Sequence, residues 1–138
     1  VTFDLQVNSF IDYNDDMSDK KTMTEAERVR SPCPIAGTLD ILGDKWSLLI
    51  IRDLFAGKKT YGEFQASPEN IPTNLLADRL KRLLKHGIIS KKPYQERPVR
   101  YAYELTDKGR TLGPILKEIV EWGLKNISGT EARIEMKL

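Results

Sequence analysis

The sequence predicts a mainly α-helical domain with one small β-hairpin, in the order helix, helix, helix, helix, hairpin, helix. Three observations support this fold class. Apolar residues repeat at helical spacing in several segments, glycines follow the predicted helix ends, and a strand-like alternation follows the most basic segment. Between Thr60 and Leu105 this order is that of a winged helix-turn-helix, with extra N- and C-terminal helices available for dimerisation.

Size and composition fit one globular domain with arms at either end. The chain has 138 residues, of which 40% are hydrophobic and 30% charged. No apolar run approaches the roughly 20 residues that cross a bilayer, and no secretory signal is visible. A single cysteine, Cys33, excludes an intrachain disulfide framework and is typical of a reducing compartment, so we expect a cytoplasmic protein without membrane partners.

Three parts are expected along the chain: an N-terminal arm over residues 1–30, a DNA-binding and dimerisation domain over 31–128, and a tail over 129–138. The arm has clustered acids and no sustained period, which predicts partial disorder. Met17 begins the series M-S-D-K-K-T, so residues before it could be an extension added for expression.

Charge is unevenly distributed around a net value of +2. Residues 1–37 hold seven acidic and four basic residues, whereas residues 38–128 hold sixteen basic and eleven acidic ones. Between Arg79 and Arg100 there are eight Lys or Arg residues and only Glu96 as an acid. Such a local excess is expected of a protein that binds a polyanion, although a solvated surface face is the alternative for any charge run.

Two helices are predicted from Pro34 onward. An apolar series suits a short first helix, which Gly43 would close in the left-handed conformation. Asp44 would then cap a second helix, from Lys45 to about Ala56, by accepting backbone N–H groups. Burial of this second helix on more than one side is indicated by its broad apolar stripe, which comprises Trp46, Leu48, Leu49, Ile50, Ile51, Leu54 and Phe55.

The next two helices form the predicted helix-turn-helix pair. Thr60 can cap a short helix, Tyr61 to Ala66, with Glu63 placed to complete a reciprocal capping box. After the linker S-P-E-N-I-P, Thr73 would cap a helix running from Asn74 to about His86. One face of that helix carries Leu76, Leu80, Leu83 and Leu84, and the opposite face carries Asn74, Asp78, Lys81, Arg82 and Lys85.

A hairpin and a final helix complete the prediction. The strands are Ile88–Lys92 and Val99–Leu105, joined by a tip, P-Y-Q-E-R-P, that two prolines stiffen. Thr106 would cap a last helix, Asp107 to about Ile127. A kink or break is expected in its first turns because they contain Gly109, Gly113 and Pro114.

This arrangement predicts how the domain would contact DNA. The second helix of such a pair enters the major groove, where Thr73 can touch a thymine methyl, Asn74 can pair with adenine, and Asp78 can accept from cytosine. A salt bridge from Asp78 to Arg82 is the alternative. We expect Lys81, Arg82 and Lys85 to contact phosphates. The hairpin is expected to contact the DNA backbone or the minor groove through Lys91, Lys92, Arg97 and Arg100.

The segment from Cys33 to Ile127 resembles the HxlR-type family of winged helix transcriptional regulators, which are relatives of the MarR-like group. The matching stretches are C-P-I-A-G-T-L-D-I-L-G-D-K-W-S-L-L-I-I-R-D-L, T-Y-G-E-F, I-P-T-N-L-L-A-D-R-L-K-R-L, H-G-I-I, R-P-V-R-Y-A-Y-E-L-T-D-K-G-R and V-E-W-G. The resemblance implies a cytoplasmic prokaryotic homodimer that binds paired half-sites of a pseudo-palindromic operator near promoters. The lead-in before Arg28 and the tail after Ser128 depart from the family pattern.

Dimerisation is also expected on physical grounds. One small winged domain makes few contacts, and two-fold symmetry lets two copies grip half-sites one helical turn apart. The alternative is that the apolar residues concerned complete the core of a monomer. The predicted dimer interface comprises Ile35, Leu39, Leu116, Ile119 and Trp122.

Cys33 is a candidate redox sensor. It stands between Pro32 and Pro34 at the predicted start of a helix, where the helix dipole, Arg28 and Arg30 favour a thiolate. Some members of the family sense oxidants or electrophiles through a cysteine in the same C-P position, so the resemblance implies an intersubunit or mixed disulfide. The alternative is a half-buried thiol without a function.

No enzyme activity, cofactor or metal is expected. His86 is the single histidine, which argues against a histidine-rich metal site, and at a helix end it suits a dipole partner or phosphate contact. A Cys33–His86 nucleophilic pair would need an orienting group and an oxyanion site that no motif supplies.

Trp46 and Trp122 could line a pocket for a small-molecule effector, although helical spacing favours core positions. The competing function class is a winged helix that binds protein, which predicts an uncharged apolar recognition face.

Overall fold

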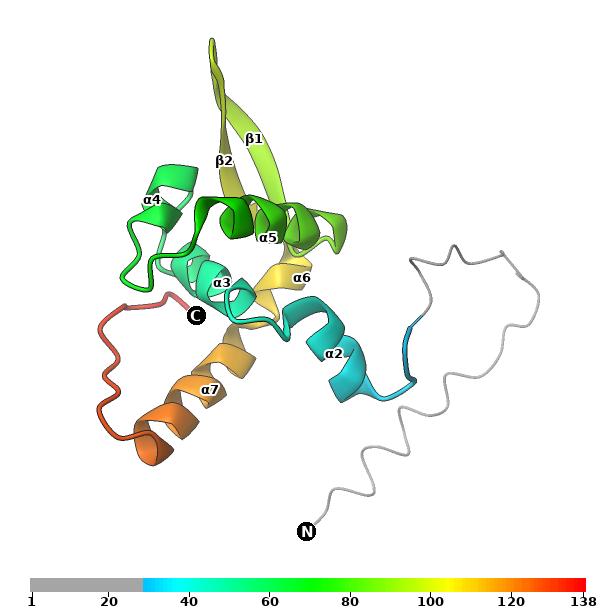
Figure 1. Cartoon of the computed structure of the whole chain (residues 1–138), viewed down its shortest axis with the longest axis vertical. Helices are drawn as coiled ribbons and strands as arrows, with labels where there is room; N and C mark the ends of the chain where they lie inside the picture. Colours follow the sequence, from blue (N-terminus) through cyan, green and yellow to red (C-terminus); the bar gives the residue numbers. More distant parts are fainter. Residues whose placement is uncertain (1–28) are drawn as a thin grey trace, which may run out of the picture. The chain divides into compact units, whose positions relative to one another are not determined.

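A computed structural model describes residues 29–138, and Figure 1 shows the helices and strands within this range. The predicted arm over residues 1–30 lies outside the described residues except for its last two. The residues from Ser31 to Leu138 form one compact unit. This unit contains α2 (Pro34–Leu42), α3 (Ser47–Phe55), α4 (Tyr61–Gln65), α5 (Thr73–Lys85), β1 (Ile89–Glu96), β2 (Val99–Leu105), α6 (Asp107–Arg110) and α7 (Gly113–Asn126).

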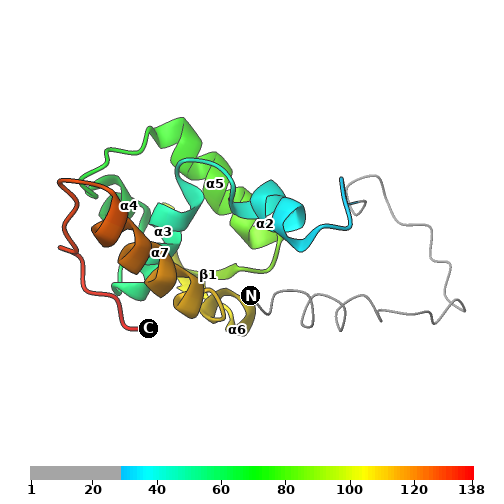
Figure 2. The same ribbon diagram turned by 90° about the horizontal axis from the view of Figure 1, so that it is seen from below.

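The core of this unit forms around α3, which lies between α5 and α7 (Figure 2). Ile50 and Ile51 of α3 are 2% and 0% exposed, so the predicted burial of this helix on several sides is confirmed. Since α3 packs against elements from both halves of the unit, it fixes the positions of α5 and the hairpin. The neighbouring elements contribute Phe64, Leu76, Leu80, Leu83, Ile88, Ile89, Leu112 and Leu116.

The turn between α2 and α3 differs from the prediction in two respects. Gly43 has φ −78°, so the predicted left-handed conformation is wrong. A side chain is excluded there by space, because a Cβ atom would lie 2.3 Å from the carbonyl oxygen of Leu39. In addition, α3 begins at Ser47 rather than Lys45. Asp44 still accepts hydrogen bonds from the backbone N–H groups at the start of α3, as predicted: its carboxylate accepts from the N–H of Trp46 at 2.9 Å and from that of Ser47 at 3.0 Å.

The start of α4 follows the prediction, whereas the start of α5 does not. Thr60 Oγ1 accepts from the Glu63 N–H, and the Glu63 carboxylate accepts from the Thr60 N–H, so the predicted capping box is confirmed. The prediction that Thr73 caps the next helix is wrong, because Thr73 is its first residue and no side chain caps it. Pro72 takes the non-helical position before it, with φ −57° and ψ 140°.

The hairpin formed by β1 and β2, called the wing below, is longer than predicted. Its strands pair from Ile89 opposite Leu105 to Glu96 opposite Val99, so the predicted six-residue tip is wrong. A shift of register between Pro93 and Gln95 lets β1 continue beyond the proline. The base of the wing is attached to the loop after α3, because the Tyr103 N–H donates to the Lys59 carbonyl oxygen at 2.7 Å.

The predicted break after the wing is confirmed, because α6 and α7 are separate helices. Thr106 caps α6 as predicted: its Oγ1 accepts from the Gly109 N–H at 3.1 Å. Gly109 is required by close packing, since a Cβ atom there would lie 2.1 Å from the Ile88 carbonyl oxygen. The single last helix predicted from Asp107 is therefore replaced by two.

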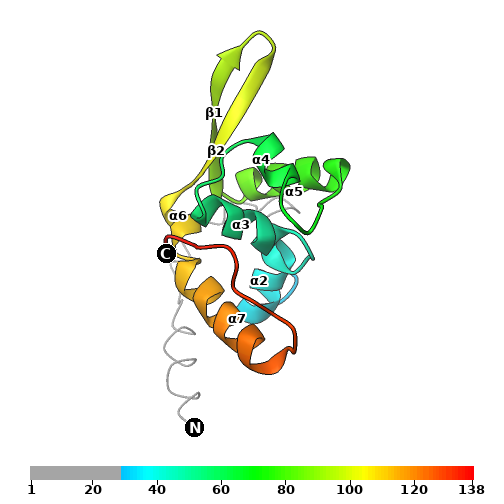
Figure 3. The same cartoon turned by 90° about the vertical axis from the view of Figure 1, so that its left-hand side faces the viewer.

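The tail after α7 returns to the core, as Figure 3 shows. Its Lys137 N–H donates to the Phe55 carbonyl oxygen at 3.0 Å, and Met136 packs against the core. The tail therefore contributes to the surface near the end of α3. None of the helices over residues 29–138 has the length and apolar character needed to cross a bilayer.

Candidate nucleic-acid interface

The helix α5 separates an apolar face from a polar one, as its spacing predicts. Leu76, Leu80 and Leu83 are at most 2% exposed and attach the helix to the core. Burial of these three side chains contributes several kcal/mol, at ~2 kcal/mol each, and it fixes the rotation of α5 about its axis. The opposite side presents Thr73, Asn74, Asp78, Lys81 and Lys85, all of which are exposed.

One ion pair, from Arg79 to Asp44, holds α5 to the turn before α3. Arg79 Nε lies 2.8 Å from Asp44 Oδ2, and the same guanidinium also pairs with Asp78. Burial raises the pKa of Asp44, but hydrogen bonds from Ser47, Trp46 and Arg79 outweigh it and lower the pKa to about 2. The carboxylate of Asp44 is therefore ionised throughout the neutral range and keeps Arg79 in place.

Two predicted DNA contacts on α5 have partners within the chain. Asp78 pairs with Arg79, so the predicted alternative of a salt bridge to Arg82 is wrong. Arg82 is half-buried, and its Nη2 donates to the Asp40 carbonyl oxygen at 2.7 Å. This bond connects α5 to the C-terminal part of α2. Arg82 has further N–H donors, so it can contact a phosphate and keep this bond.

The remaining cations of α5 are free to meet an external anion. Within residues 29–138, no hydrogen bond or ion pair engages the side chain of Lys81 or Lys85, and the same holds for the amide of Asn74. Burial, followed by the charges of Lys85, Arg82 and Lys108, lowers the pKa of His86 at the end of α5. The three neighbouring cations, which add to the effect of burial, place positive charge around the end of α5, and this suits a polyanion.

The wing presents a second group of exposed cations. Lys91 Nζ lies 4.3 Å from the centre of the Tyr101 ring, a cation–π contact that holds its position. Over the described part of the chain, no carboxylate pairs with Lys92, Arg97 or Arg100. Figures 1 and 3 show the wing rising beside the end of α5 and projecting beyond it. All four predicted wing residues thus project from the element that stands next to α5.

Sequence reasoning did not include a groove that connects α4 with the wing. It encloses about 490 Å³ and is lined by aromatic side chains, including Tyr61, Tyr94 and Tyr101, beside Arg100. Tyr61 also donates its hydroxyl to the Thr73 carbonyl oxygen at 2.7 Å, which connects α4 to the first turn of α5. The available signal was that Tyr94 and Tyr101 lie in the same short segment as Arg97 and Arg100, since tyrosine hydroxyls contact phosphate and sugar oxygens.

Four of the five predicted interface residues are exposed on α2 and α7. Ile35 is 71% exposed, Leu39 55%, Ile119 46% and Trp122 64%. Leu116 is 5% exposed and belongs to the core of the chain itself, so it is not available to a second copy. The other four residues are therefore exposed apolar side chains of α2 and α7, as are Ile115 and Leu124 of α7, which are 46% and 48% exposed.

Cys33 is exposed at the residue that precedes α2. Its own N–H donates to Ser31 Oγ at 3.1 Å, and its backbone is extended, with φ −67° and ψ 123°. The half-buried thiol considered as an alternative is thus not observed. Arg28, one of the two cations expected beside the thiol, lies outside the described residues.

Comparison with known proteins identifies the family of the chain. The HxlR-like helix-turn-helix family model matches residues 41–131. The uncharacterized HTH-type transcriptional regulator YdeP of Bacillus subtilis is 37% identical over 93 residues, which are 67% of this chain and 73% of YdeP. Residues 41–131 include α4, α5 and the two strands of the wing.

Two solved structures are similar in fold. The redox regulator HypR, in its oxidised form, has a TM-score of 0.62 and 36% identity, covering 68% of this chain and 97% of HypR. The transcriptional regulator YodB of B. subtilis, in its reduced form, has a TM-score of 0.59 and 30% identity, covering 73% of this chain and all of YodB. The order of elements, the winged helix-turn-helix and these matches agree, so this chain belongs to the HxlR-like family of helix-turn-helix transcriptional regulators.

Proposed function

We propose that the chain is a sequence-specific DNA-binding regulator that acts as a homodimer at a promoter. The observation that carries the proposal is the group of exposed cations on α5 and the wing. Lys81, Lys85, Lys92, Arg97 and Arg100 have no carboxylate partner among the described residues. Two adjacent elements that present unpaired cations suit a helix in the major groove and a wing along the neighbouring backbone or minor groove.

The first turns of α5 would read the bases. Thr73 and Asn74 are exposed at the N-terminal end of the helix, where recognition helices meet base edges. Asn74 has no competing partner among the described residues and is free to pair with an adenine edge. Asp78 shares its carboxylate with Arg79, so a contact with cytosine would use its remaining acceptor capacity.

The cations would position the protein rather than read sequence. Lys81, Arg82 and Lys85 project from the middle and end of α5, and Lys91, Lys92, Arg97 and Arg100 from the wing. Contacts of this kind go to phosphates, which set the register of the protein along the duplex. The tyrosines of the groove between α4 and the wing would add neutral contacts to the same backbone.

A homodimer would form through α2 and α7. Ile35, Leu39, Ile119 and Trp122 are large apolar side chains, each about half exposed or more. Their burial in a two-fold interface would remove this surface from water. The two α5 helices would then meet half-sites about 34 Å apart on one face of a pseudo-palindromic operator. A regulator of this kind acts where the chromosome is, in the cytoplasm.

We further propose that an oxidant or electrophile acts through Cys33. The thiol is exposed at the start of α2, the helix that carries Ile35 and Leu39 of the proposed interface. HypR is described as a redox regulator, and YodB is known in reduced and diamide-treated forms. A disulfide between two Cys33 residues, or between Cys33 and a small thiol, would change how the two copies pack.

A salt titration tests the DNA-binding proposal against the alternative of a protein-binding winged helix. Binding to a promoter fragment is measured by fluorescence anisotropy at increasing salt. We expect the logarithm of the affinity to fall linearly with the logarithm of salt concentration, with a slope of about −0.9 per phosphate contact. Affinity that does not change with salt would contradict the proposal, because α5 and the wing would not be neutralising phosphates.

A further inference from the structure

The turn between α4 and α5, residues 66–72, is held to the core by few apolar side chains. Within this turn Ile71 is 9% exposed and Ser67 is 5% exposed, whereas the other residues are exposed. The turn leads directly into Thr73, the first residue of α5. Its position therefore determines where the first residues of α5 lie, and polar contacts contribute much of what holds it.

A buried carboxylate near the end of α3 contacts this turn. Asp53 is 2% exposed, and Ser67 donates its hydroxyl to Oδ2 of Asp53. Lys58, in the loop after α3, donates from Nζ to Ser67 Oγ at 2.6 Å and lies 3.8 Å from Asp53 Oδ2. A buried charge is costly unless it is both paired and hydrogen-bonded. Asp53 meets both conditions, and the turn supplies one of its partners.

Arg52 extends these contacts to the exposed side of the turn. Its guanidinium donates to Asp53 Oδ1 from Nε at 3.0 Å and from Nη2 at 2.8 Å. It also donates to both carboxylate oxygens of Glu69, from Nη1 at 2.6 Å and from Nη2 at 2.8 Å. These bonds from Arg52 lower the pKa of Glu69, although partial burial opposes them, so the carboxylate is ionised in the neutral range. The pair between Arg52 and Glu69 is bidentate, which fixes its geometry.

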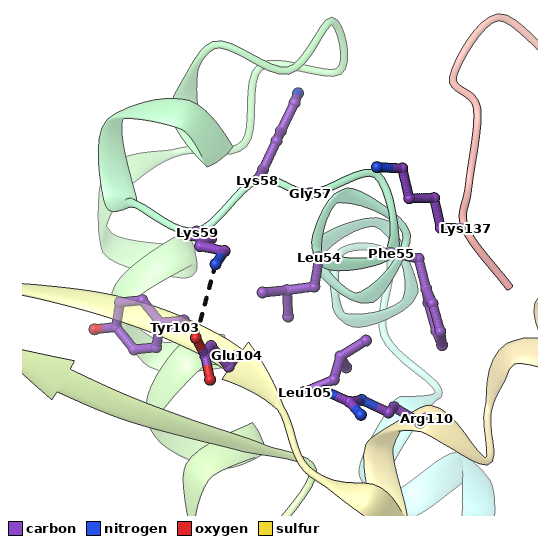
Figure 4. Close-up of a pocket in the computed structure, with 10 residues that line it drawn as sticks. All are labelled: Leu54, Phe55, Gly57, Lys58, Lys59, Tyr103, Glu104, Leu105, Arg110 and Lys137. Carbon is purple, nitrogen blue, oxygen red and sulfur yellow. Dashed lines mark ion pairs between the residues drawn. The ribbon is translucent and has the colours of Figure 1, made fainter.

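The loop after α3 makes separate contacts with the turn and with the wing. Figure 4 shows two neighbouring lysines of this loop pointing in different directions, Lys59 toward Glu104 of β2 and Lys58 away from it. Lys59 Nζ lies 3.7 Å from the Glu104 carboxylate, and both side chains are about half exposed, so water screens this pair. The bond from Lys58 to Ser67 therefore serves the turn and does not compete with the wing.

We propose that Arg52 and Asp53 are positioning residues for sequence recognition, because they hold the turn that sets the orientation of Thr73 and Asn74. This inference rests on the DNA-binding function proposed above. Asp53 is buried and Arg52 is engaged by two carboxylates, so both act through the turn rather than by contacting DNA.

Base reading is more sensitive to the position of the turn than phosphate binding is. A hydrogen-bonded pair between an amide side chain and a base edge depends on distance and direction. Phosphate contacts from lysines tolerate small displacements, because the ammonium group is a point charge on a flexible stem. Loosening of the turn therefore lowers the preference for one base sequence and leaves the affinity for unrelated DNA nearly unchanged.

Hydrogen–deuterium exchange of the full chain without DNA tests whether these contacts hold the turn. Ser67→Ala removes the hydroxyl that bonds to Asp53, and Glu69→Gln removes the charge that pairs with Arg52. Each should speed exchange over residues 66–76 about tenfold, the effect of losing one hydrogen bond to a charged group, and leave α7 unchanged. Thermal unfolding checks that both variants are folded.

Glu131→Gln is the control for the exchange experiment. Glu131 Oε2 lies 2.7 Å from Arg133 Nε, so the variant removes a comparable ion pair within the tail. It should leave exchange over residues 66–76 unchanged. Unchanged exchange of the turn in either Ser67→Ala or Glu69→Gln, or the same increase in Glu131→Gln, would overturn the proposal.

Base discrimination tests the functional step. A duplex that the unmodified protein selects from a random library is compared with a scrambled duplex of equal length by fluorescence anisotropy. Glu69→Gln should weaken binding to the selected duplex about fivefold, the lower end of what one base contact contributes. Affinity for the scrambled duplex and the salt slope should not change, because no phosphate contact is lost. No loss, or equal losses on the two duplexes, would contradict a positioning role.

A double-variant cycle with Asn74→Ala connects the turn to the residue that it positions. If Glu69 acts through Asn74, the double variant should lose less affinity for the selected duplex than the sum of the two single losses. Additive losses, or an Asn74→Ala variant with undiminished preference, would also overturn the proposal. Salt-independent binding by the unmodified protein would contradict the DNA-binding function itself, a failure that leaves the exchange result unchanged.

Discussion

Arg82 Nη2 donates to the carbonyl oxygen of Asp40 at 2.7 Å and thereby connects the recognition helix α5 to α2. A second connection joins Arg79 of α5 to Asp44, two residues after α2 ends. The helix α2 begins next to Cys33 and carries Ile35 and Leu39 of the proposed dimer interface. A shift of α2 at that interface would therefore reach α5 through two arginines, in addition to the contact of α2 with the core through Leu42.

Arg82 is expected to act by geometry as well as charge. Arg82→Lys keeps the charge but loses the planar set of donors that can hold Asp40 and a phosphate together. We expect Arg82→Lys to weaken operator binding nearly as much as Arg82→Ala, by roughly 1–2 kcal/mol. Anisotropy titrations at several salt concentrations measure this. Full affinity in Arg82→Lys would reduce the role of Arg82 to that of a point charge.

Lys81 is the matched control for this experiment because it is exposed on the same helix and has no partner among the described residues. Lys81→Ala should weaken binding to all sequences alike and reduce the salt slope by about one. A phosphate contact made by Arg97 of the wing predicts the same behaviour for Arg97→Ala.

Asn74 is expected to determine base preference. Its amide is exposed and unengaged within the described residues, at the end of α5 that is proposed to enter the major groove. Asn74→Ala should remove about 1–3 kcal/mol of discrimination at one base pair and leave affinity for a mismatched site nearly unchanged. Binding is compared on a matched operator and on single-base variants of it. A uniform loss on all of them would assign Asn74 to the backbone instead.

The sequence predicted the parts of the fold that depend on local pattern. Apolar spacing located α3 and α5, and the pairing of Thr60 with Glu63 located the start of α4. The predicted wing is too short because proline usually interrupts a strand, so the first strand is predicted to end at Lys92. In the structure a shift of register lets β1 continue beyond Pro93. That shift depends on the pairing with β2, which no local pattern records.

The candidate site was predictable in composition but not in its internal contacts. Exposed cations on α5 and the wing follow from helical and strand periods. The partner of Arg82 is a backbone carbonyl 42 residues away, and such an acceptor has no signature in the sequence. The sequence also could not show that Leu116 is a core residue, so the predicted dimer interface includes it. Its spacing on α7 matches that of Ile119, and only the packing of α7 on α3 distinguishes the two.

Asp44 is expected to contribute stability that depends on pH. Its folded pKa, about 2, is below the unfolded value of 3.8, so the contribution is complete above pH 3.8 and is lost as pH falls toward 2. Because the side chain is partly exposed, we expect Asp44→Asn to lower the free energy of unfolding by about 1–2 kcal/mol at pH 7. Urea unfolding at pH 7 and pH 3 should show the difference narrowing at the lower pH.

Glu118→Gln provides the control for this measurement. Glu118 is exposed on α7 and has no ion pair among the described residues, so its variant should unfold like the unmodified protein at both values of pH. A difference for Asp44→Asn that is the same at pH 7 and pH 3 would mean that the variant acts through packing rather than through the carboxylate charge.

Trp122 is expected to be central to the dimer. The side chain is 64% exposed on α7, so a substitution there leaves the described core unchanged. Trp122→Glu would place a charge in the apolar interface and convert the protein to monomer at micromolar concentration. Light scattering after size-exclusion chromatography measures the mass, with Lys117→Glu on the same helix as the control. A stable Trp122→Glu dimer would exclude this face of α7 as the interface.

Cys33 is expected to make operator binding sensitive to oxidants. Diamide accepts two hydrogens from two thiols, and the thiols are joined by an Sγ–Sγ bond, so treated protein should run as a covalent dimer on a non-reducing gel. Operator affinity should change after treatment and return with dithiothreitol. Cys33→Ala, which removes the single thiol of the chain, should show neither the covalent dimer nor the change in affinity. If the native protein and Cys33→Ala respond alike, the effect of diamide does not pass through this thiol, and α2 is not a redox-controlled element.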